Sequence, residues 1–248
     1  MAGLVLMLFA VVAVAVLARR GTIAVPVAFG TATVFALGAA VAELTDNVID
    51  HDGLTRGDLG ELQWFIAHRS GWVTSLAVGI SDAGDTLPMA ALAGVVCAWA
   101  AWRRRWDQVV LVAVATAGAG ALVLALKMLV GRSRPPVIDR LVPETNQSFP
   151  SGHSLSSAVV LGVLATLVVL HTHRRAVRIF AVTAAVSAVA LVGLSRLYLG
   201  VHWPSDVLGG WTIGMLWLAT CVTVYMGFRR RSATGHAVLA SSGSATDT

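Results

Sequence analysis

Seven long apolar runs, each with at most one charged residue, occupy most of the chain and constrain what it can fold into. Each run is close to the length of about 20 residues that a helix needs to cross the hydrocarbon core of a bilayer. The 248 residues are 56% hydrophobic and only 12% charged, which is about half the charged share of a soluble domain. We therefore expect an all-α polytopic membrane bundle, and the composition excludes a disordered chain, a disulfide scaffold and a nucleic-acid-binding domain. The runs are 1–18, 22–42, 86–102, 108–126, 153–170, 176–194 and 206–227.

The six runs from residue 22 onward are interpreted as core spans, and 1–18 as an extra amino-terminal span. A cleaved signal peptide or a re-entrant segment is the alternative for 1–18. Against a signal peptide, Arg19 and Arg20 follow the apolar stretch, whereas a signal peptide begins with basic residues. The predicted organisation is the extra span over 1–20, one membrane domain over 21–228, and a basic flank with a disordered cytoplasmic tail over 229–248. The oligomeric state stays open.

Four arginine clusters orient the chain, because cytoplasmic loops of membrane proteins carry an excess of Lys and Arg. Each cluster follows an odd-numbered run, so all four fall on one face of the membrane, which we assign to the cytoplasm of a cell (plasma) membrane. The carboxyl terminus is then cytoplasmic, and the segments 43–85, 127–152 and 195–205 are extracytoplasmic. The first of these segments is expected to form an interfacial cap with a short helix near Leu59–Ile66. The clusters are Arg19–Arg20, Arg103–Arg105, Arg174–Arg178 and Arg229–Arg231.

Three cations come from separate polar segments on the predicted outer face: Lys127, Arg134 and Arg196. An unpaired cation at membrane depth is costly, so an anion is expected to share their site. Guanidinium groups bind phosphate oxygens in pairs. Ser151 and Gly152 follow Pro150 at the start of a predicted helix, where free N–H groups would bind the same anion.

Two histidines and a carboxylate complete a catalytic set on the same face. Asp206 lies four residues after His202 and can fix its tautomer, which leaves the other ring nitrogen as a nucleophile. His153 can act as general acid and then as general base. Asp139 and Glu144 are loop residues without matching carboxylates, so we predict a centre without metal or other cofactor.

These segments resemble the three motifs of the type 2 phosphatidic acid phosphatase (lipid phosphate phosphatase) family, whose pocket is shared with vanadium haloperoxidases. The matches are Lys127 with Arg134-Pro135, Pro150-Ser151-Gly152-His153, and Ser195-Arg196 with His202 and Asp206. The resemblance covers roughly residues 86–227. It implies that His202 forms a phosphohistidine, Asp206 orients it, His153 is acid and base, and Lys127, Arg134, Arg196, Ser151 and Gly152 hold the phosphoryl oxygens.

The predicted function is hydrolysis of a membrane lipid phosphate or diphosphate on the extracytoplasmic face, without nucleic acid as a partner. Phosphatidic acid, phosphatidylglycerol phosphate and a polyprenyl diphosphate are the candidate substrates. The same site could serve a lipid phosphotransferase. A seven-span transporter is a third hypothesis, against which the spans carry no charge near their midpoints. Arg132, inside the first motif but outside its fixed positions, is expected to face the lipid headgroups.

Overall fold

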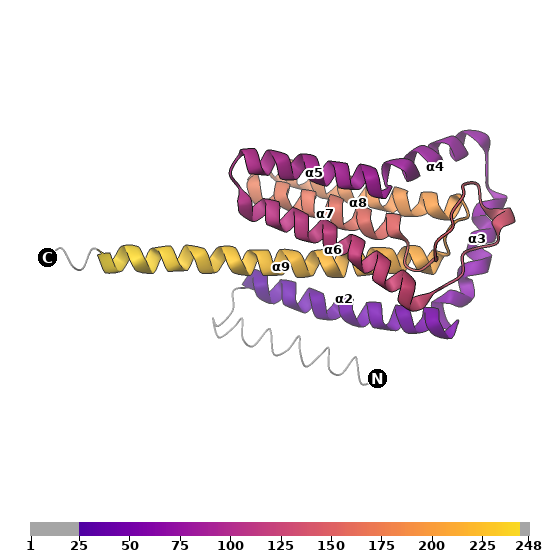
Figure 1. Cartoon of the computed structure of the whole chain (residues 1–248), viewed down its shortest axis with the longest axis horizontal. Coiled ribbons are helices and arrows are strands. Elements are labelled where there is room, and N and C mark those ends of the chain that lie inside the picture. Colours follow the sequence, from indigo (N-terminus) through magenta and orange to yellow (C-terminus); the bar gives the residue numbers. More distant parts are fainter. Residues whose placement is uncertain (1–24, 244–248) are drawn as a thin grey trace.

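A computed structural model of the chain describes the backbone of residues 25–243 and the side chains of residues 25–230. The long helices lie side by side, while α3 and α4 sit at one end of the bundle (Figure 1). No strand occurs in the described range, which confirms the predicted all-α class. The helices are α2 (Val25–Asp50), α3 (Asp58–Ala67), α4 (Gly71–Ala83), α5 (Thr86–Trp102), α6 (Trp106–Val130), α7 (Gly152–His171), α8 (Arg175–Tyr198) and α9 (Pro204–Gly243), with short 3-10 helices η1 (Gly53–Gly57) and η2 (Val137–Asp139).

Five helices in the described part are long and apolar enough to cross a membrane: α2, α6, α7, α8 and the first 27 residues of α9. Helices α4 and α5 meet at a bend of 47° and together make a sixth candidate span. The helical membrane bundle is thus confirmed, and the run 86–102 forms the second half of this bent candidate span. The run 1–18 lies outside the described residues.

Helix α7 is the centre of the bundle. Half of its most apolar 18-residue window is buried, against 6% of the corresponding window of α2. It contacts α5, α6, α8 and α9. The backbones of α7 and α9 approach closely at Gly210, where a Cβ atom would lie 2.7 Å from the carbonyl oxygen of Ser151. This contact brings the start of α9, where the third motif ends at Asp206, against the start of α7, which carries the second motif.

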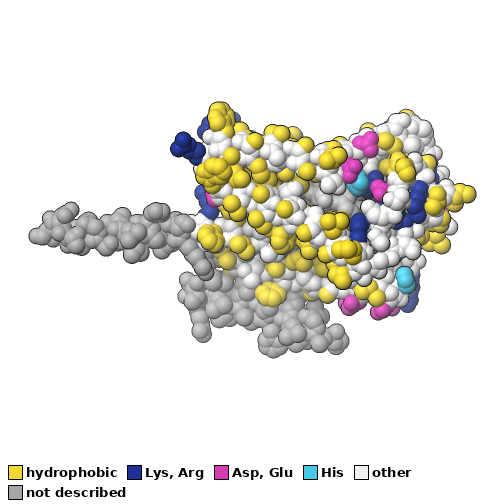
Figure 2. All heavy atoms as spheres, viewed as in Figure 1, with side chains coloured by type: hydrophobic (Ala, Val, Ile, Leu, Met, Phe, Trp, Pro, Cys, Tyr) yellow, Lys and Arg dark blue, Asp and Glu magenta, His cyan; other side chains and the backbone are white. Residues whose placement is uncertain are grey.

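The surface of the bundle separates apolar and charged side chains. Figure 2 shows hydrophobic side chains spread over the helical body and charged side chains gathered toward its two ends. Exposed arginines, among them Arg229, occupy the end of the bundle where the α5–α6 and α7–α8 connections lie. The three motifs lie at the opposite end, beside α3 and α4. This division fits a bundle whose body is surrounded by lipid.

Two segments differ from the expected loop and tail. Residues 43–50, predicted to begin the extracytoplasmic loop, continue α2, because Leu44 and Val48 point inward one turn apart and are buried. The predicted short cap helix is present as α3. At the other end, the backbone of α9 is helical to Gly243, although a basic flank with a disordered tail was predicted over 229–248. Residues 244–248 lie outside the described range.

Candidate active site

The three polar segments converge on one cavity at the α3–α4 end of the bundle. Gly131 ends α6 with a left-handed backbone (φ +62°), which turns the chain from the Lys127 helix toward Arg134. The second and third segments begin α7 and connect α8 to α9. The cavity has a volume of about 450 Å³. Its lining includes six of the eight predicted site residues, Lys127, Arg134, Gly152, His153, Arg196 and His202.

Lys127 and Arg134 are held in place by the loop that precedes α7. The Lys127 ammonium donates to the Asn146 side-chain oxygen at 3.2 Å and to the carbonyl of Gln147. Arg134 donates from Nε to the carbonyl of Asn146 at 2.7 Å and from Nη1 to that of Val201 at 2.6 Å. Burial lowers the pKa of Arg134, yet a guanidinium stays charged in proteins. The loop therefore fixes two cations at the cavity wall.

Glu144 lies between the arginines of the cavity, contrary to its interpretation as an isolated loop carboxylate. It accepts from Nη2 of Arg196 and, at 3.3 Å, from Nη2 of Arg134. Partial burial raises its pKa, but the charges of Arg196 and Arg134 outweigh this and lower it below the ordinary value. Arg196 also donates from Nη1 to Ser81, and its buried Nε has no partner among the described residues. The arginines thus present donors suited to an anion with several oxygens.

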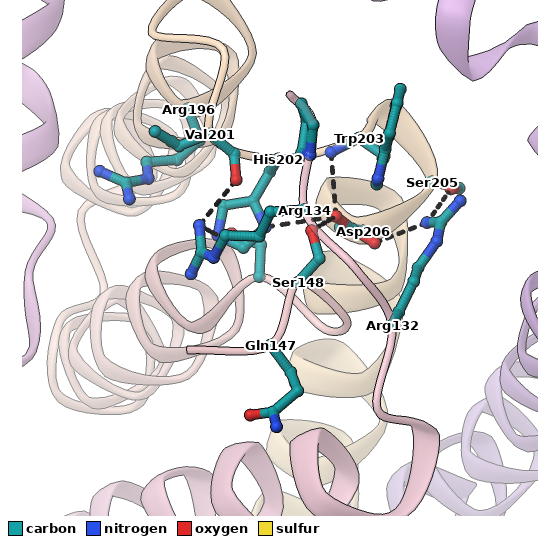
Figure 3. A network of polar contacts seen from close by, with 12 residues as sticks. Arg132, Arg134, Gln147, Ser148, Arg196, Val201, His202, Trp203, Ser205 and Asp206 are labelled. Carbon is teal, nitrogen blue, oxygen red and sulfur yellow. Dashed lines mark hydrogen bonds and ion pairs between the residues drawn. The ribbon is translucent and has the colours of Figure 1, made fainter. Parts of the chain in front are cut away.

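The hydrogen bonds around His202 settle which ring nitrogen carries the proton. Its Nδ1 is 3.3 Å from Oδ2 of Asp206, and its Nε2 is 3.3 Å from Nη1 of Arg134 (Figure 3). A guanidinium can only donate, so Nε2 is the acceptor and Nδ1–H donates to the carboxylate. Burial lowers the pKa of His202 to about 3, although Asp206 acts in the opposite direction. The imidazole is therefore neutral at pH 7, with the Nε2 lone pair directed to the cavity.

His153 faces the same cavity from the first turn of α7. Its side chain is 15% exposed, and its Nε2 is 3.6 Å from Oδ1 of Asp85. Asp85 caps α5 by accepting from the Thr86 N–H at 2.6 Å, so this carboxylate is fixed at the bend between α4 and α5. The broken span therefore supplies a carboxylate beside the predicted acid and base.

The start of α7 differs from the prediction at Ser151. Its N–H, expected to be free for an anion, donates to the carbonyl of Asp206 at 3.1 Å. Its hydroxyl accepts from the Ser154 hydroxyl at 3.0 Å and caps the helix. Ser151 thus joins α7 to α9 in this geometry. Gly152 does line the cavity, where a Cβ atom would have only Val123 within 4 Å, at 3.4 Å.

The sequence prediction misplaced one side chain at the site, Arg132, and missed another, Asp58. Arg132, expected to face the lipid headgroups, has a side chain only 8% exposed and donates to Asp206 at 2.6 Å and to Asp58 at 2.7 Å. Asp58 and Asp206 are buried, and a buried carboxylate needs a paired cation because it has lost its hydration. Arg132 supplies that cation and is therefore drawn inward, away from the lipid headgroups. Asp58 lies on α3, far away in sequence. The sequence signal for this contact was only that Asp58 precedes an apolar helical pattern.

The three polar segments that line the cavity lie in the part of the chain that matches known proteins. Residues 108–230 match the model of the PAP2 superfamily. The chain is 37% identical over 157 residues to phosphatidylglycerophosphatase B of Bacillus subtilis. The matched stretch covers 60% of this chain and 73% of that protein. Over 70 residues it is 41% identical to an undecaprenyl-diphosphatase of Sulfolobus acidocaldarius, covering 28% of this chain and 30% of that relative.

Two solved structures share the fold. A crystal structure of a transmembrane PAP2-type phosphatidylglycerolphosphate phosphatase from Bacillus subtilis superposes with a TM-score of 0.69 at 29% identity. The match covers 80% of this chain and 96% of that one. The crystal structure of LpxE from Aquifex aeolicus gives a TM-score of 0.54 at 20% identity, over 66% and 94% of the two chains. That second likeness concerns the fold alone.

Proposed function

The chain belongs to the PAP2 superfamily, and on that premise we propose that it hydrolyses a lipid phosphate or diphosphate through a phosphohistidine at His202. As a member, it is a multi-pass membrane lipid phosphatase, a hydrolase of phosphoric ester or diphosphate bonds. The seven-span transporter hypothesis is therefore set aside. The substrate, the membrane face and the chemical steps are our proposals.

The observation that carries the mechanism is the unprotonated Nε2 of His202 facing a cavity lined by three cations. Arg134 donates to that nitrogen at 3.3 Å, so the same guanidinium is within reach of oxygens on a phosphorus atom placed beside it. Arg196 and Lys127 line the same cavity. Preorganised donors of this kind stabilise the charge of a phosphoryl transition state, by about 3 kcal/mol for one donor. We assign these three cations, with the Gly152 N–H, to the phosphoryl oxygens.

In the first step, Nε2 of His202 forms a bond to phosphorus while the bond from phosphorus to the leaving oxygen breaks. The leaving group is a lipid alkoxide or, for a diphosphate, a phosphate. His153, protonated at this stage, donates its proton to the leaving oxygen. Asp206 accepts the Nδ1–H bond throughout and stabilises the positive charge that develops on the imidazole.

In the second step, the now neutral His153 removes a proton from water as the water oxygen attacks phosphorus. The bond between phosphorus and Nε2 breaks, the nitrogen regains its lone pair, and inorganic phosphate leaves. The proton taken from water restores the acid for the next cycle. The steps use only protein side chains and water, so we expect chelators to have no effect. Vanadate should inhibit, because it imitates five-coordinate phosphorus.

We propose phosphatidylglycerol phosphate as the first substrate to test, with a polyprenyl diphosphate and phosphatidic acid next. A relative and a solved structure that this chain resembles are named for the first of these lipids, and another relative for the undecaprenyl carrier. We propose that the cavity opens on the extracytoplasmic face of the plasma membrane. The positive-inside rule supports this face, because Arg103–Arg105 and Arg174–Arg178 lie at the α5–α6 and α7–α8 connections, opposite the cavity, and Arg229 lies beside Asp107 at the start of α6.

Phosphate release from a panel of purified lipids in detergent tests the proposal. We expect the wild type to act best on one lipid and His202→Ala to lose about 10⁴-fold or more in kcat while remaining folded. Full activity in His202→Ala contradicts the mechanism. Transfer of the phosphoryl group to an added alcohol in place of water would instead identify the phosphotransferase alternative.

A further inference from the structure

A buried network behind His202 joins the cap helix α3 to Asp206, the predicted partner of His202. Arg132 lies between two carboxylates, with Nη1 2.6 Å from Oδ1 of Asp206 and Nη2 2.7 Å from Oδ2 of Asp58. The side chains are 8%, 0% and 6% exposed, respectively. In Figure 3, Arg132 approaches Asp206 from the side opposite His202. Neither Arg132 nor Asp58 lines the cavity, so neither has a direct role toward the phosphate.

The hydrogen bonds of Asp58 fix its carboxylate in one orientation. Its Oδ1 accepts from the Ser205 N–H at 2.9 Å, and its Oδ2 accepts from the Ser205 hydroxyl at 2.6 Å as well as from Arg132. The Ser205 hydroxyl in turn accepts from Nη1 of Arg132 at 2.7 Å. Asp58, Arg132 and Ser205 therefore form a closed ring next to Asp206. Such a ring holds the guanidinium in a single rotamer.

The orientation of Asp206 decides which of its oxygens faces the nucleophile. Arg132 engages Oδ1, which leaves Oδ2 for the Nδ1–H of His202. Oδ2 also accepts from the Trp203 N–H at 2.9 Å and from the Ser148 hydroxyl. Rotation of the carboxylate would break the bond that fixes the histidine tautomer. Among the side chains of residues 25–230, Arg132 is the one charged donor to Oδ1 of Asp206.

Stability is a weak reason for this arrangement. Buried ion pairs are often no better for stability than apolar packing of the same volume, because desolvation offsets the attraction. Two carboxylates on one guanidinium also leave one negative charge uncompensated within the group. That charge is favourable beside an imidazole that becomes cationic when phosphorus bonds to it. The network thus suits the reaction better than it suits folding alone.

We propose that Arg132 and Asp58 are positioning residues of the phosphatase reaction, which hold Asp206 in the rotamer that keeps Nε2 of His202 nucleophilic. This inference rests on the proposed function. It gives α3 a role in catalysis through Asp58, in addition to covering the end of the bundle.

The test compares Asp58→Asn and Arg132→Lys, singly and together, with the wild type on its best lipid in detergent. Asp58→Asn keeps the size of the side chain but removes its negative charge. Arg132→Lys keeps the positive charge but removes the guanidinium that contacts both carboxylates. Asp52→Asn and Arg56→Lys are matched controls, because that pair lies in the same segment at 3.8 Å with side chains 53% and 75% exposed. Thermal unfolding of each variant is measured in parallel.

We expect each network variant to lose on the order of 10- to 100-fold in kcat, the range for residues that orient a primary catalytic group. KM should stay within about 3-fold, since phosphate contacts are untouched. The double variant should be no worse than the more damaged single variant, because both act through Asp206. The controls should keep wild-type kcat and KM.

Three results overturn the inference: kcat within about 2-fold of wild type, loss confined to KM or to the unfolding midpoint, or additive effects in the double variant. An inactive wild type on every lipid refutes the proposed function and the inference with it. An active wild type with unaffected network variants refutes the inference alone.

Discussion

The two ends of the bundle use arginine in opposite ways. At the end formed by the α5–α6 and α7–α8 connections, Arg103, Arg104 and Arg175 are exposed. At the other end, the side chains of Arg132, Arg134 and Arg196 are at most 8% exposed. Arginine is therefore exposed at one end, whereas around the cavity at the other end it is bound to a defined set of acceptors.

The difference shows that the net charge alone does not say what the arginines at either end do. An exposed guanidinium stays hydrated and contributes little to stability, whereas a buried one must replace its lost hydration with fixed acceptors. At the cavity those acceptors are Glu144, Asp206, Asp58 and main-chain carbonyls. The formal charge of +5 therefore does not distinguish the exposed cations, which we predict to orient the chain, from the buried cations that we assign to a phosphate or to the catalytic groups.

The largest test of this contrast removes one arginine from each end. Arg196→Gln should lower kcat/KM by about 100- to 1000-fold, because a donor to the transition state is lost. Arg103→Gln removes the same charge from an exposed position and should leave kcat/KM within about 2-fold of wild type. Steady-state phosphate release measures both. Equal losses at the two positions would refute the division.

A second test separates the cavity from the packing that supports it. A methyl group at Gly152 meets only Val123, in ordinary contact, so Gly152→Ala should fold normally and raise KM by about 10-fold as the methyl enters the anion site. Gly210→Ala should instead lower stability by about 1–3 kcal/mol, because its methyl would collide with the Ser151 carbonyl. Unfolding and kinetics together distinguish the two. An unstable Gly152→Ala with unchanged KM would contradict the assignment.

A third test concerns pH and the buried imidazole. The folded pKa of His202 lies near 3, below its ordinary 6.5, so the unfolded chain binds a proton that the folded protein resists. The stability from this group is complete above pH 6.5 and decreases as pH falls toward 3. Between pH 6.5 and 5 the loss is about 2 kcal/mol.

Thermal unfolding at pH 7 and pH 5 measures this term. His202→Gln should lose less stability over that interval than the wild type, whereas His51→Gln, at an exposed position, should behave as the wild type does. Equal losses in the wild type and His202→Gln would show that the imidazole is not buried in its neutral form.

The spans and the cavity residues were predictable because their signals are local in sequence. Apolar runs of membrane-crossing length identify helices directly, and the spacing between His202 and Asp206 places them within reach across the start of α9. The extension of α2 through Leu44 and Val48 was missed because acidic residues on its other face resembled a loop.

The polar network behind the site was not predictable, because it depends on contacts between distant segments. Asp58 lies 74 positions from Arg132 and 147 from Ser205, and nothing near it in sequence indicates either partner. The N–H of Ser151 was similarly assigned to an anion, since its true acceptor, the Asp206 carbonyl, becomes adjacent only when α7 packs against α9.

The most direct test of the central claim is to trap the covalent intermediate. Enzyme turning over a lipid labelled with radioactive phosphate is quenched in alkali, where phosphohistidine survives, and the label is mapped by peptide analysis. We predict an acid-labile label on the peptide that contains His202, absent from His202→Ala and retained in Asp52→Asn. Absence of label in the active wild type, or label that persists in His202→Ala, would contradict the account.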